Sequence, residues 1–162
     1  MNTSTYGNRS AIGASPDQVI ISLPSTRGYE KVARSAAASV AEEMGFTQER
    51  IEDVKTAIAE VCSNAIEHGN REDRRAHVAV LLTAAKEQLE INVADEGLTP
   101  MPDVLPMPGQ PDSGEAGSRG WGMFFISQLV DEVEITRLPE GGNMVKLVIY
   151  LKPTRKSKGK NG

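Results

Sequence analysis

The sequence is poor in cysteine and in long apolar runs. Its one cysteine, Cys62, excludes an internal disulfide framework and a multi-cysteine zinc site. Cys62 lies in the apolar run "AIAEVCSNAI", which predicts a small buried residue and not a reactive thiol. No apolar run approaches the ~20 residues of a membrane-spanning helix, and "MNTSTYGNRSAIGASP" does not resemble a signal peptide. We therefore expect a cytoplasmic protein without a membrane role.

Excess positive charge is also lacking. The formal net charge is −4, which gives no general argument for binding nucleic acid directly. The polar start, residues 1–16, predicts a disordered arm, and the basic end, residues 152–162, predicts a solubilising tail. Between them, residues 17–151 are long enough for one domain with a real core.

Apolar spacing predicts the order strand, helix, helix, strand, strand, loop, helix, strand, strand. Apolar residues at every second position indicate strands, and apolar residues at every third or fourth position indicate helices. Glycine- and proline-rich turns join the later strands as hairpins, so we expect an α/β fold with helices on one face of a mostly antiparallel sheet. Strands are predicted at 17–25, 76–85, 88–95, 131–138 and 144–151, and helices at 27–45, 47–69 and 121–130.

Three polar side chains recur along the second predicted helix. In "EVCSNAIEHGN", Glu60, Asn64 and His68 stand four residues apart, at the border of the apolar face. A partly buried Glu can act as a general base, and an Asn oxygen can bind Mg²⁺ together with phosphate and water oxygens. Taken alone, however, a solvated helix face explains this stripe better than a site does.

Two further features follow in the chain. Asp95 ends a strand and precedes Gly97, so its carboxylate could accept a hydrogen bond from a ligand's amino group. After the loop 97–120, "GSRGWGMFF" opens a helix with glycines whose N–H groups could hold an anion. Taken alone, Asp95 and Gly97 are better explained by a plain turn. The glycines are a moderate phosphate-binding motif, and a flexible joint would explain them without a ligand. The glycines of this stretch are Gly117, Gly120 and Gly122, and Arg119 adds positive charge.

Together and in this order, these features resemble the GHKL ATPase superfamily. They match its N-box, its Asp-x-Gly box, its ATP lid and its second glycine box. From about residue 17 to 151 the chain is similar to the anti-sigma-factor serine kinases of bacterial partner-switching systems. The similarity is carried by "IEDVKTAIAEVCSNAIEHG", "VADEG" and "GWGMFFISQLVDEVEI".

The resemblance implies a two-layer α/β sandwich that binds ATP and Mg²⁺ under a lid at about 98–119. It implies Mg²⁺ binding by Asn64, a base role for Glu60, and adenine binding by Asp95 with Gly97 beside it. Backbone N–H groups of the second glycine box would hold the phosphates. The implied ATP-binding set also contains His68, Gly117, Arg119, Gly120, Gly122 and Met123.

The resemblance also implies partners. The substrate would be a serine on an anti-anti-sigma (STAS-type) protein, the second partner a sigma factor, and the protein itself a homodimer. Arg34 matches an arginine that family members use toward these partners; the alternative is an exposed arginine without a partner.

Departures from the family pattern leave alternatives open. Trp121 replaces a smaller aliphatic residue, Met144 stands where a threonine often helps to bind adenine, and the lid is rich in proline. A regulatory module that binds ATP or protein without kinase turnover is therefore the second hypothesis. A sensor histidine kinase domain is a weaker third, because no pair of helices with a phosphoacceptor histidine precedes the domain; His68 is better interpreted as a wall residue.

Overall fold

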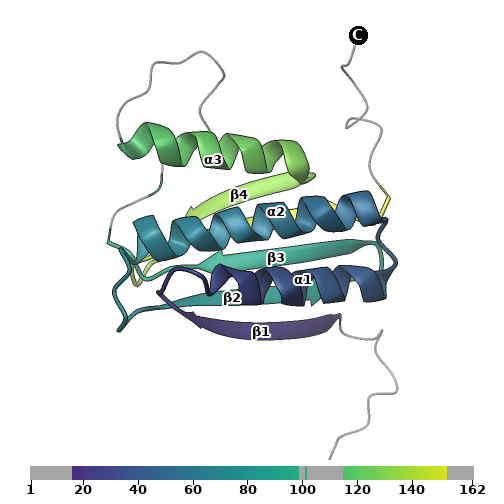
Figure 1. The fold of residues 1–162 in the computed structure, drawn as a ribbon, viewed down its shortest axis with the longest axis horizontal. Coiled ribbons are helices and arrows are strands. Elements are labelled where there is room, and N and C mark those ends of the chain that lie inside the picture. The colour runs from purple at the N-terminus through teal and green to yellow at the C-terminus, as the bar shows by residue number, and fades with distance from the viewer. Residues whose placement is uncertain (1–15, 99–100, 102–114, 153–162) are drawn as a thin grey trace, which may run out of the picture.

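The structure is a computed structural model and describes residues 16–98, 101 and 115–152, with side chains of the last range from Gly122 onward. The predicted arm except for Pro16, most of the predicted lid and most of the basic tail lie outside the described residues. The order of elements agrees with the sequence prediction (Figure 1). The elements are β1 (Asp17–Pro24), α1 (Glu30–Met44), α2 (Gln48–Asn64), a π-helical turn (Ala65–Gly69), β2 (His77–Ala84), β3 (Gln88–Ala94), α3 (Glu115–Leu129), β4 (Glu132–Arg137) and β5 (Asn143–Tyr150).

The five strands form one sheet in the order β1-β2-β3-β5-β4. All four pairings of the described strands are antiparallel. Two pairings are hairpins, because short turns join β2 to β3 and β4 to β5. The connection from β1 to β2 passes through α1 and α2. The predicted sandwich with helices on one face of a mostly antiparallel sheet is confirmed.

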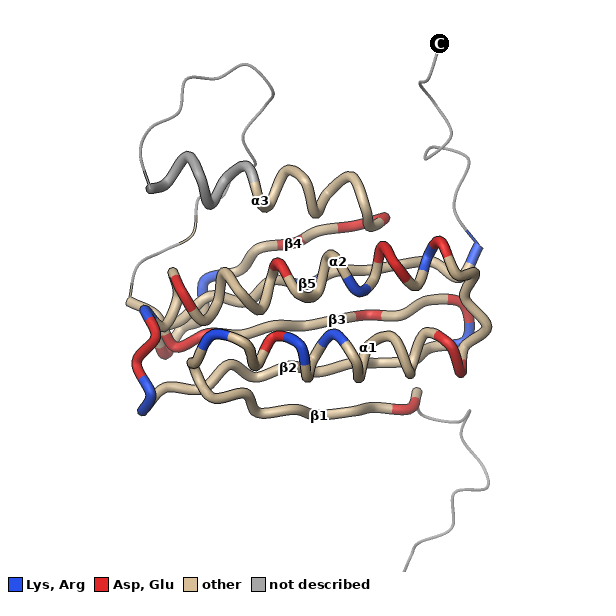
Figure 2. The backbone as a smooth tube through the Cα atoms, viewed as in Figure 1, with Lys and Arg blue, Asp and Glu red and all other residues tan. Residues whose placement is uncertain are grey.

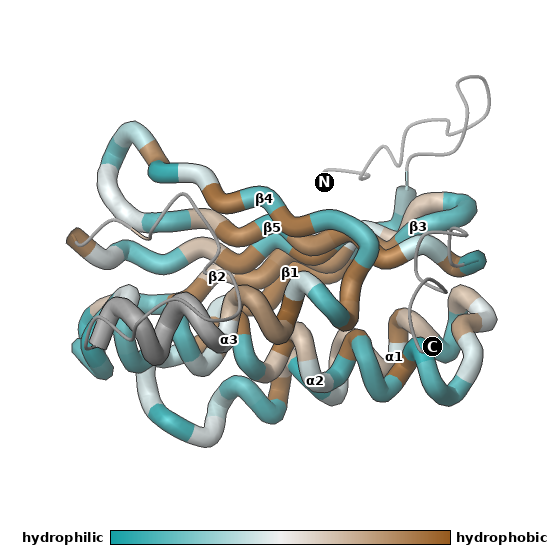
Figure 3. Tube along the Cα trace, turned by 90° about the horizontal axis from the view of Figure 1, so that it is seen from above, coloured by the Kyte–Doolittle hydropathy of each residue, from teal (hydrophilic) through white to brown (hydrophobic). Residues whose placement is uncertain are grey.

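The core lies between the sheet and the helical layer. Figure 3 shows the three helices on one side of the sheet, and Figure 1 shows α2 between α1 and α3. Alternate residues of the central strands point toward the helices and are buried, as the period of two requires. On α1 the buried positions are all alanine, which lets that helix approach the sheet closely. The central-strand core comprises Val78, Val80, Leu82, Leu89, Ile91 and Val93.

Local signals explain where the first two helices end and begin. Gly45 follows α1 with φ of 85°, a left-handed conformation that glycine adopts without steric cost. Thr47 caps α2, since its side chain accepts a hydrogen bond from the Arg50 N–H at 3.3 Å. No helix among the described residues is both long enough and apolar enough to cross a bilayer.

The regular α-helix stops at Asn64, earlier than predicted. The chain continues through the π-helical turn, where the Asn70 N–H donates to the Ala65 carbonyl five residues earlier at 2.8 Å. Side-chain spacing therefore changes after Asn64. Glu60 and Asn64 follow the predicted helical face, whereas His68 does not continue it.

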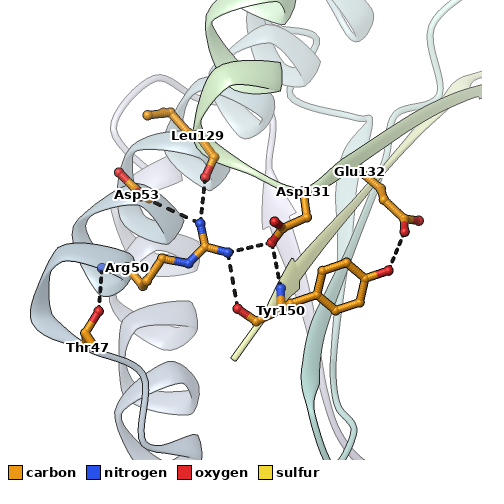
Figure 4. Close-up of polar contacts among 7 residues, drawn as sticks. All are labelled: Thr47, Arg50, Asp53, Leu129, Asp131, Glu132 and Tyr150. Carbon is orange, nitrogen blue, oxygen red and sulfur yellow. Dashed lines mark hydrogen bonds and ion pairs between the residues drawn. The ribbon is translucent and has the colours of Figure 1, made fainter. Parts of the chain in front are cut away.

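A buried ion pair joins α2, α3 and β5 at the end of α2 far from Asn64 (Figure 4). The Arg50 guanidinium donates to Asp131 at 2.5 Å, to the Tyr150 carbonyl at 3.2 Å and to the Leu129 carbonyl at 3.4 Å. Asp131 in turn accepts from the Tyr150 N–H at 2.8 Å. These contacts fix the C-terminal end of α3 against the sheet.

The start of α3 differs from the prediction. We expected a helix from Trp121, with glycines before it, but α3 begins at Glu115. Glu115 and Ala116 explain the earlier start, because both favour helix and an acidic residue is favourable in the first turn. Gly117, Arg119 and Gly120 therefore lie within the helix and not in the loop before it.

Candidate functional site

Glu60, Asn64 and Gly122 meet where α2 packs against α3. A Cβ added at Gly122 would lie 2.6 Å from Glu60 Oε1 and 3.5 Å from Asn64 Nδ2. Glycine thus lets the α3 backbone come close to both polar side chains. Asn64 is 8% exposed, and its buried Nδ2 has no hydrogen-bond partner among the described residues. A buried donor without a partner is costly, so this group suits an acceptor supplied by a ligand.

Asp95 follows β3 as predicted and is 5% exposed. Its Oδ1 accepts three hydrogen bonds: from the Gly97 N–H at 2.9 Å, from the Asn143 N–H at 3.0 Å and from Asn143 Nδ2 at 3.3 Å. Three donors on one oxygen fix the orientation of the carboxylate. The other oxygen, Oδ2, keeps its capacity to accept a hydrogen bond.

Three glycines allow the close backbone contacts around Asp95. A Cβ at Gly69 would lie 2.3 Å from Asp95 Oδ2, and one at Gly97 would lie 2.1 Å from the Gly69 carbonyl oxygen. At Gly142 a Cβ would lie 2.0 Å from the Asp95 carbonyl oxygen, and its φ of 97° also favours glycine. The π-helical turn brings Gly69 to this point, so the end of α2, the end of β3 and the β4–β5 turn depend on one another.

Asn64 and Asp95 line the same cavity, together with Met101 and Met123. The remaining volume is only about 10 Å³, because apolar side chains fill the space. Met101 and Met123 are both buried, at 6% and 2% exposure. Methionine adapts its shape readily, and a nucleobase can enter only if these two side chains shift. Met123 thus lies beside Asn64 and Asp95, and its role in binding a ligand stays a prediction.

Asn143 and two of the glycines were missed by the sequence reasoning. The family pattern singles out Met144, but alternation along β5 turns Met144 to the far face of the sheet, while Asn143 and Val145 point inward. Asn143 Oδ1 also accepts from the Met101 N–H at 3.1 Å. In the sequence, Gly69 is the last residue of the predicted helix 47–69, and Gly142 lies between the last two predicted strands. Only contacts distant in sequence reveal their roles.

The other predicted residues lie as follows. His68 is half-buried in the π-helical turn and does not line the cavity of Asn64 and Asp95. Arg34 is exposed on α1. The side chains of Arg119 and Trp121 lie outside the described residues. The binding roles of Gly117 and Gly120, as of all these residues, stay predictions.

Cys62 is fully buried in the core beside the site. Burial raises the pKa of its thiol to about 12, with a smaller contribution from the charge of Glu30. The prediction that Cys62 is a small buried residue is confirmed.

The fold and this set of contacts define a nucleotide-binding domain of a known class. Residues 23–149 match the family model described as "Histidine kinase-like ATPase domain". This match covers most of the chain, so the protein belongs to that family. The expected superfamily is thereby confirmed.

Individual relatives indicate a more specific class of protein than the family model does. The chain is 29% identical over 144 residues to the serine-protein kinase RsbW of Bacillus subtilis (strain 168), covering 86% of this chain and 89% of the relative. It is 30% identical over 126 residues to the serine-protein kinase RsbW of Bacillus pumilus (strain SAFR-032), covering 74% and 78%.

One solved structure is similar in fold. It contains the RsbU and RsbW domains of a Mycobacterium tuberculosis protein, and it superimposes with a TM-score of 0.60 at 24% identity. The match covers 86% of this chain and 34% of that longer chain. This likeness supports the fold alone.

Proposed function

We propose that the protein is an ATP-dependent serine protein kinase and anti-sigma factor of a partner-switching system. The convergence of Glu60, Asn64 and Asp95 carries this proposal, because it combines a candidate base, an orphaned amide and an oriented carboxylate in adjoining positions. The similarity to serine-protein kinases RsbW over most of the chain supports it.

Each residue has a role in the proposed reaction. Asp95 Oδ2 accepts from the adenine amino group, while Asn143 holds the carboxylate in place. Asn64 would hold Mg²⁺ through its oxygen, and its orphaned Nδ2 suits a phosphate oxygen. Mg²⁺ would supply neutralisation of phosphate charge. Glu60 orients the serine hydroxyl and accepts its proton as the phosphoryl group transfers.

The remaining roles complete the proposal. The backbone of Gly120 and Gly122, with Gly117 nearby, holds the phosphates, and Arg119 adds positive charge. The substrate is a serine on an anti-anti-sigma (STAS-type) protein, and the second partner is a sigma factor that the protein sequesters through a surface that includes Arg34. The protein acts in the cytoplasm as a homodimer and contacts neither nucleic acid nor membrane directly.

A phosphate-transfer assay tests this function. The purified protein receives radiolabelled ATP, Mg²⁺ and single-domain anti-anti-sigma proteins from its own genome. We expect transfer to a serine, loss of transfer on removal of Mg²⁺ with EDTA, and a fall of at least about 100-fold in Glu60→Gln. ATP affinity of Glu60→Gln should remain near that of the wild type.

Two other results would change the assignment. Tight ATP binding without transfer to any candidate would favour a regulatory module that binds ATP but does not turn over. Failure to bind ATP would exclude both nucleotide-dependent functions. Asp95→Asn provides the binding-deficient comparison, since it weakens the acceptor for the adenine amino group.

A further inference from the structure

Asn70 is a buried polar residue in the connection from the π-helical turn to β2. Residues 71–75 of this connection are all charged, with both signs present (Figure 2), and none of them is buried. Asn70, by contrast, is 6% exposed. A buried amide is tolerated only when its donors and its acceptor are paired, so the partners of Asn70 show which segments it holds together.

The Asn70 amide connects three segments that are distant in sequence. Its Oδ1 accepts a hydrogen bond from the Glu96 N–H at 2.7 Å. Its Nδ2 donates to Ser25 Oγ at 2.8 Å and to the His77 carbonyl at 3.1 Å. Ser25 is fully buried and donates in turn to the Ala76 carbonyl at 2.8 Å. One side chain thus joins the residue after β1, the first residue of β2 and the loop that follows β3.

Main-chain contacts hold Asn70 itself in place. Its N–H donates to the Ala65 carbonyl at 2.8 Å, and its carbonyl accepts from the Asp73 N–H at 3.0 Å. Arg71 and Glu72 lie between Asn70 and Asp73 with φ of 51° and 56°. This left-handed conformation costs free energy in residues that carry a Cβ, and it persists where the surrounding contacts determine it. The fold therefore fixes the position from which the Asn70 side chain reaches Glu96.

The hydrogen bond to Glu96 fixes the peptide group that follows Asp95. Because a peptide group is planar, holding the Glu96 N–H also sets the direction of the Asp95 carbonyl. That carbonyl lies against Gly142, where an added Cβ would be 2.0 Å from its oxygen. Asn143 holds the Asp95 carboxylate from the β5 side. Asn70 thus holds the backbone of the same residue from the side of the π-helical turn.

We propose that Asn70 is a positioning residue for recognition of the adenine amino group. It does not line the cavity that contains Asn64 and Asp95. It acts through the peptide group between Asp95 and Glu96, and so keeps the Asp95 carboxylate in place. Preference for a purine with a 6-amino group then depends on Asn70, whereas binding of the triphosphate does not. This inference rests on the proposed ATP-dependent function and adds a residue that sets the choice of nucleobase.

A comparison of ATP with ITP isolates this effect. ITP carries an oxygen in place of the 6-amino group, while its ribose and triphosphate are the same. General damage to the site therefore lowers both affinities alike and leaves their ratio unchanged. We expect the wild type to bind Mg·ATP at least about tenfold more tightly than Mg·ITP in calorimetric titration. Asn70→Ala should reduce this preference to less than about threefold.

Ser25→Ala is the matched control. It removes a buried hydrogen bond of the same amide but leaves the bond from the Glu96 N–H to Asn70. It should lower the free energy of unfolding and keep the wild-type preference for ATP. Asn70→Asp retains an acceptor for the Glu96 N–H, so its preference should stay within about threefold of wild type. Asn70→Ser has a side chain one bond shorter; it should lose the preference as Asn70→Ala does, and it replaces that variant if alanine prevents folding.

The outcomes separate this inference from the proposed function. Wild-type preference in folded Asn70→Ala or Asn70→Ser would overturn the positioning role and leave the kinase function intact. Equal loss of preference in Ser25→Ala would also overturn it, because the whole network and not the bond to Glu96 would then be responsible. If the wild type binds ATP and ITP equally, adenine recognition at Asp95 fails, and the role of Asn70 with it.

Discussion

Gly122 and Gly97 both make close contacts, but with different parts of the candidate site. The contact at Gly122 involves the flexible end of Glu60, whereas the contact at Gly97 involves the carbonyl of Gly69. The Glu60 side chain can shift at little cost in free energy. A shift of the backbone at Gly97 away from Gly69 would change the geometry of the site. The same substitution should therefore have different effects at these two positions.

We predict that Gly122→Ala keeps the fold and loses turnover. Alanine in a helix is favoured over glycine by up to about 1 kcal/mol, so the free energy of unfolding should stay the same or rise. The added Cβ displaces the Glu60 carboxylate, and kcat should fall about tenfold or more while ATP affinity changes by less than about threefold. Calorimetric titration with ATP and steady-state kinetics measure both quantities. Unchanged kcat would contradict the placement of Glu60.

For Gly97→Ala we expect the opposite pattern. Its Cβ would lie 2.1 Å from the Gly69 carbonyl oxygen, so the start of the predicted lid must move away from the π-helical turn. ATP affinity should fall at least tenfold, and the free energy of unfolding should fall by about 1–3 kcal/mol. Urea denaturation and ATP titration measure these effects. Wild-type affinity in this variant would mean that the contact is not needed for binding.

The buried thiol predicts a pH dependence of stability. The pKa of Cys62 is raised to about 12 in the folded protein and is ~8.5 in an unfolded chain. The protonated thiol therefore contributes its full stability below pH ~8.5, and this contribution is lost as the pH rises toward 12. Between pH 8 and 10, the stability difference between wild type and Cys62→Ala should shrink by about 2 kcal/mol. Parallel pH profiles of the two proteins in urea denaturation would contradict this assignment.

At the scale of elements, the ion pair between Arg50 and Asp131 connects α2 to the chain that follows α3. Their side chains are 11% and 7% exposed. Arg50→Met leaves Asp131 buried without its partner, so we expect a loss of about 3 kcal/mol in the free energy of unfolding. Arg50 lies about 21 Å along α2 from Asn64, so ATP affinity of the folded variant should be unchanged.

Two further variants serve as comparisons for Arg50→Met. The double variant Arg50→Met/Asp131→Leu should be more stable than Arg50→Met, because no unpaired charge remains buried. Lys86→Met, at an exposed lysine, should change the free energy of unfolding by no more than about 0.5 kcal/mol. Chemical denaturation of all four proteins measures these differences, and a double variant no more stable than Arg50→Met would contradict the prediction.

Local sequence signals account for most elements but not for the whole site. Gly45 and Thr47 act through neighbours within a few residues, so helix ends were predictable there. Glu60 and Asn64 were predictable because the α-helical period holds as far as Asn64. The same reasoning does not hold for His68, because the π-helical turn changes the spacing of side chains after Asn64. Asn143 acts across 48 positions of sequence, on Asp95, and no local pattern reveals such a contact.

At the scale of the whole molecule, ligand binding and folding are linked. A ligand that binds only the folded protein stabilises it by about 2.7 kcal/mol at a concentration 100 times its Kd. We expect Mg·ATP to raise the melting temperature of wild type and of Glu60→Gln alike, since Glu60 serves transfer and not binding. Asp95→Asn should show a much smaller rise. Differential scanning fluorimetry measures the shifts, and an equal rise in Asp95→Asn would contradict adenine recognition at this carboxylate.

The contacts of Gly69, Gly97 and Gly142 also limit how this domain can be recombined with its relatives. Each glycine belongs to a different stretch of sequence. Gly69 is required by the side chain of Asp95, Gly97 by the backbone of Gly69, and Gly142 by the backbone of Asp95. A hybrid that exchanges only residues 60–70 would keep its hydrophobic pattern and still misplace Asp95. We expect a hybrid to keep the position of Asp95 only when residues 60–70, 95–97 and 142–143 are exchanged together, because their energetic effects are not additive.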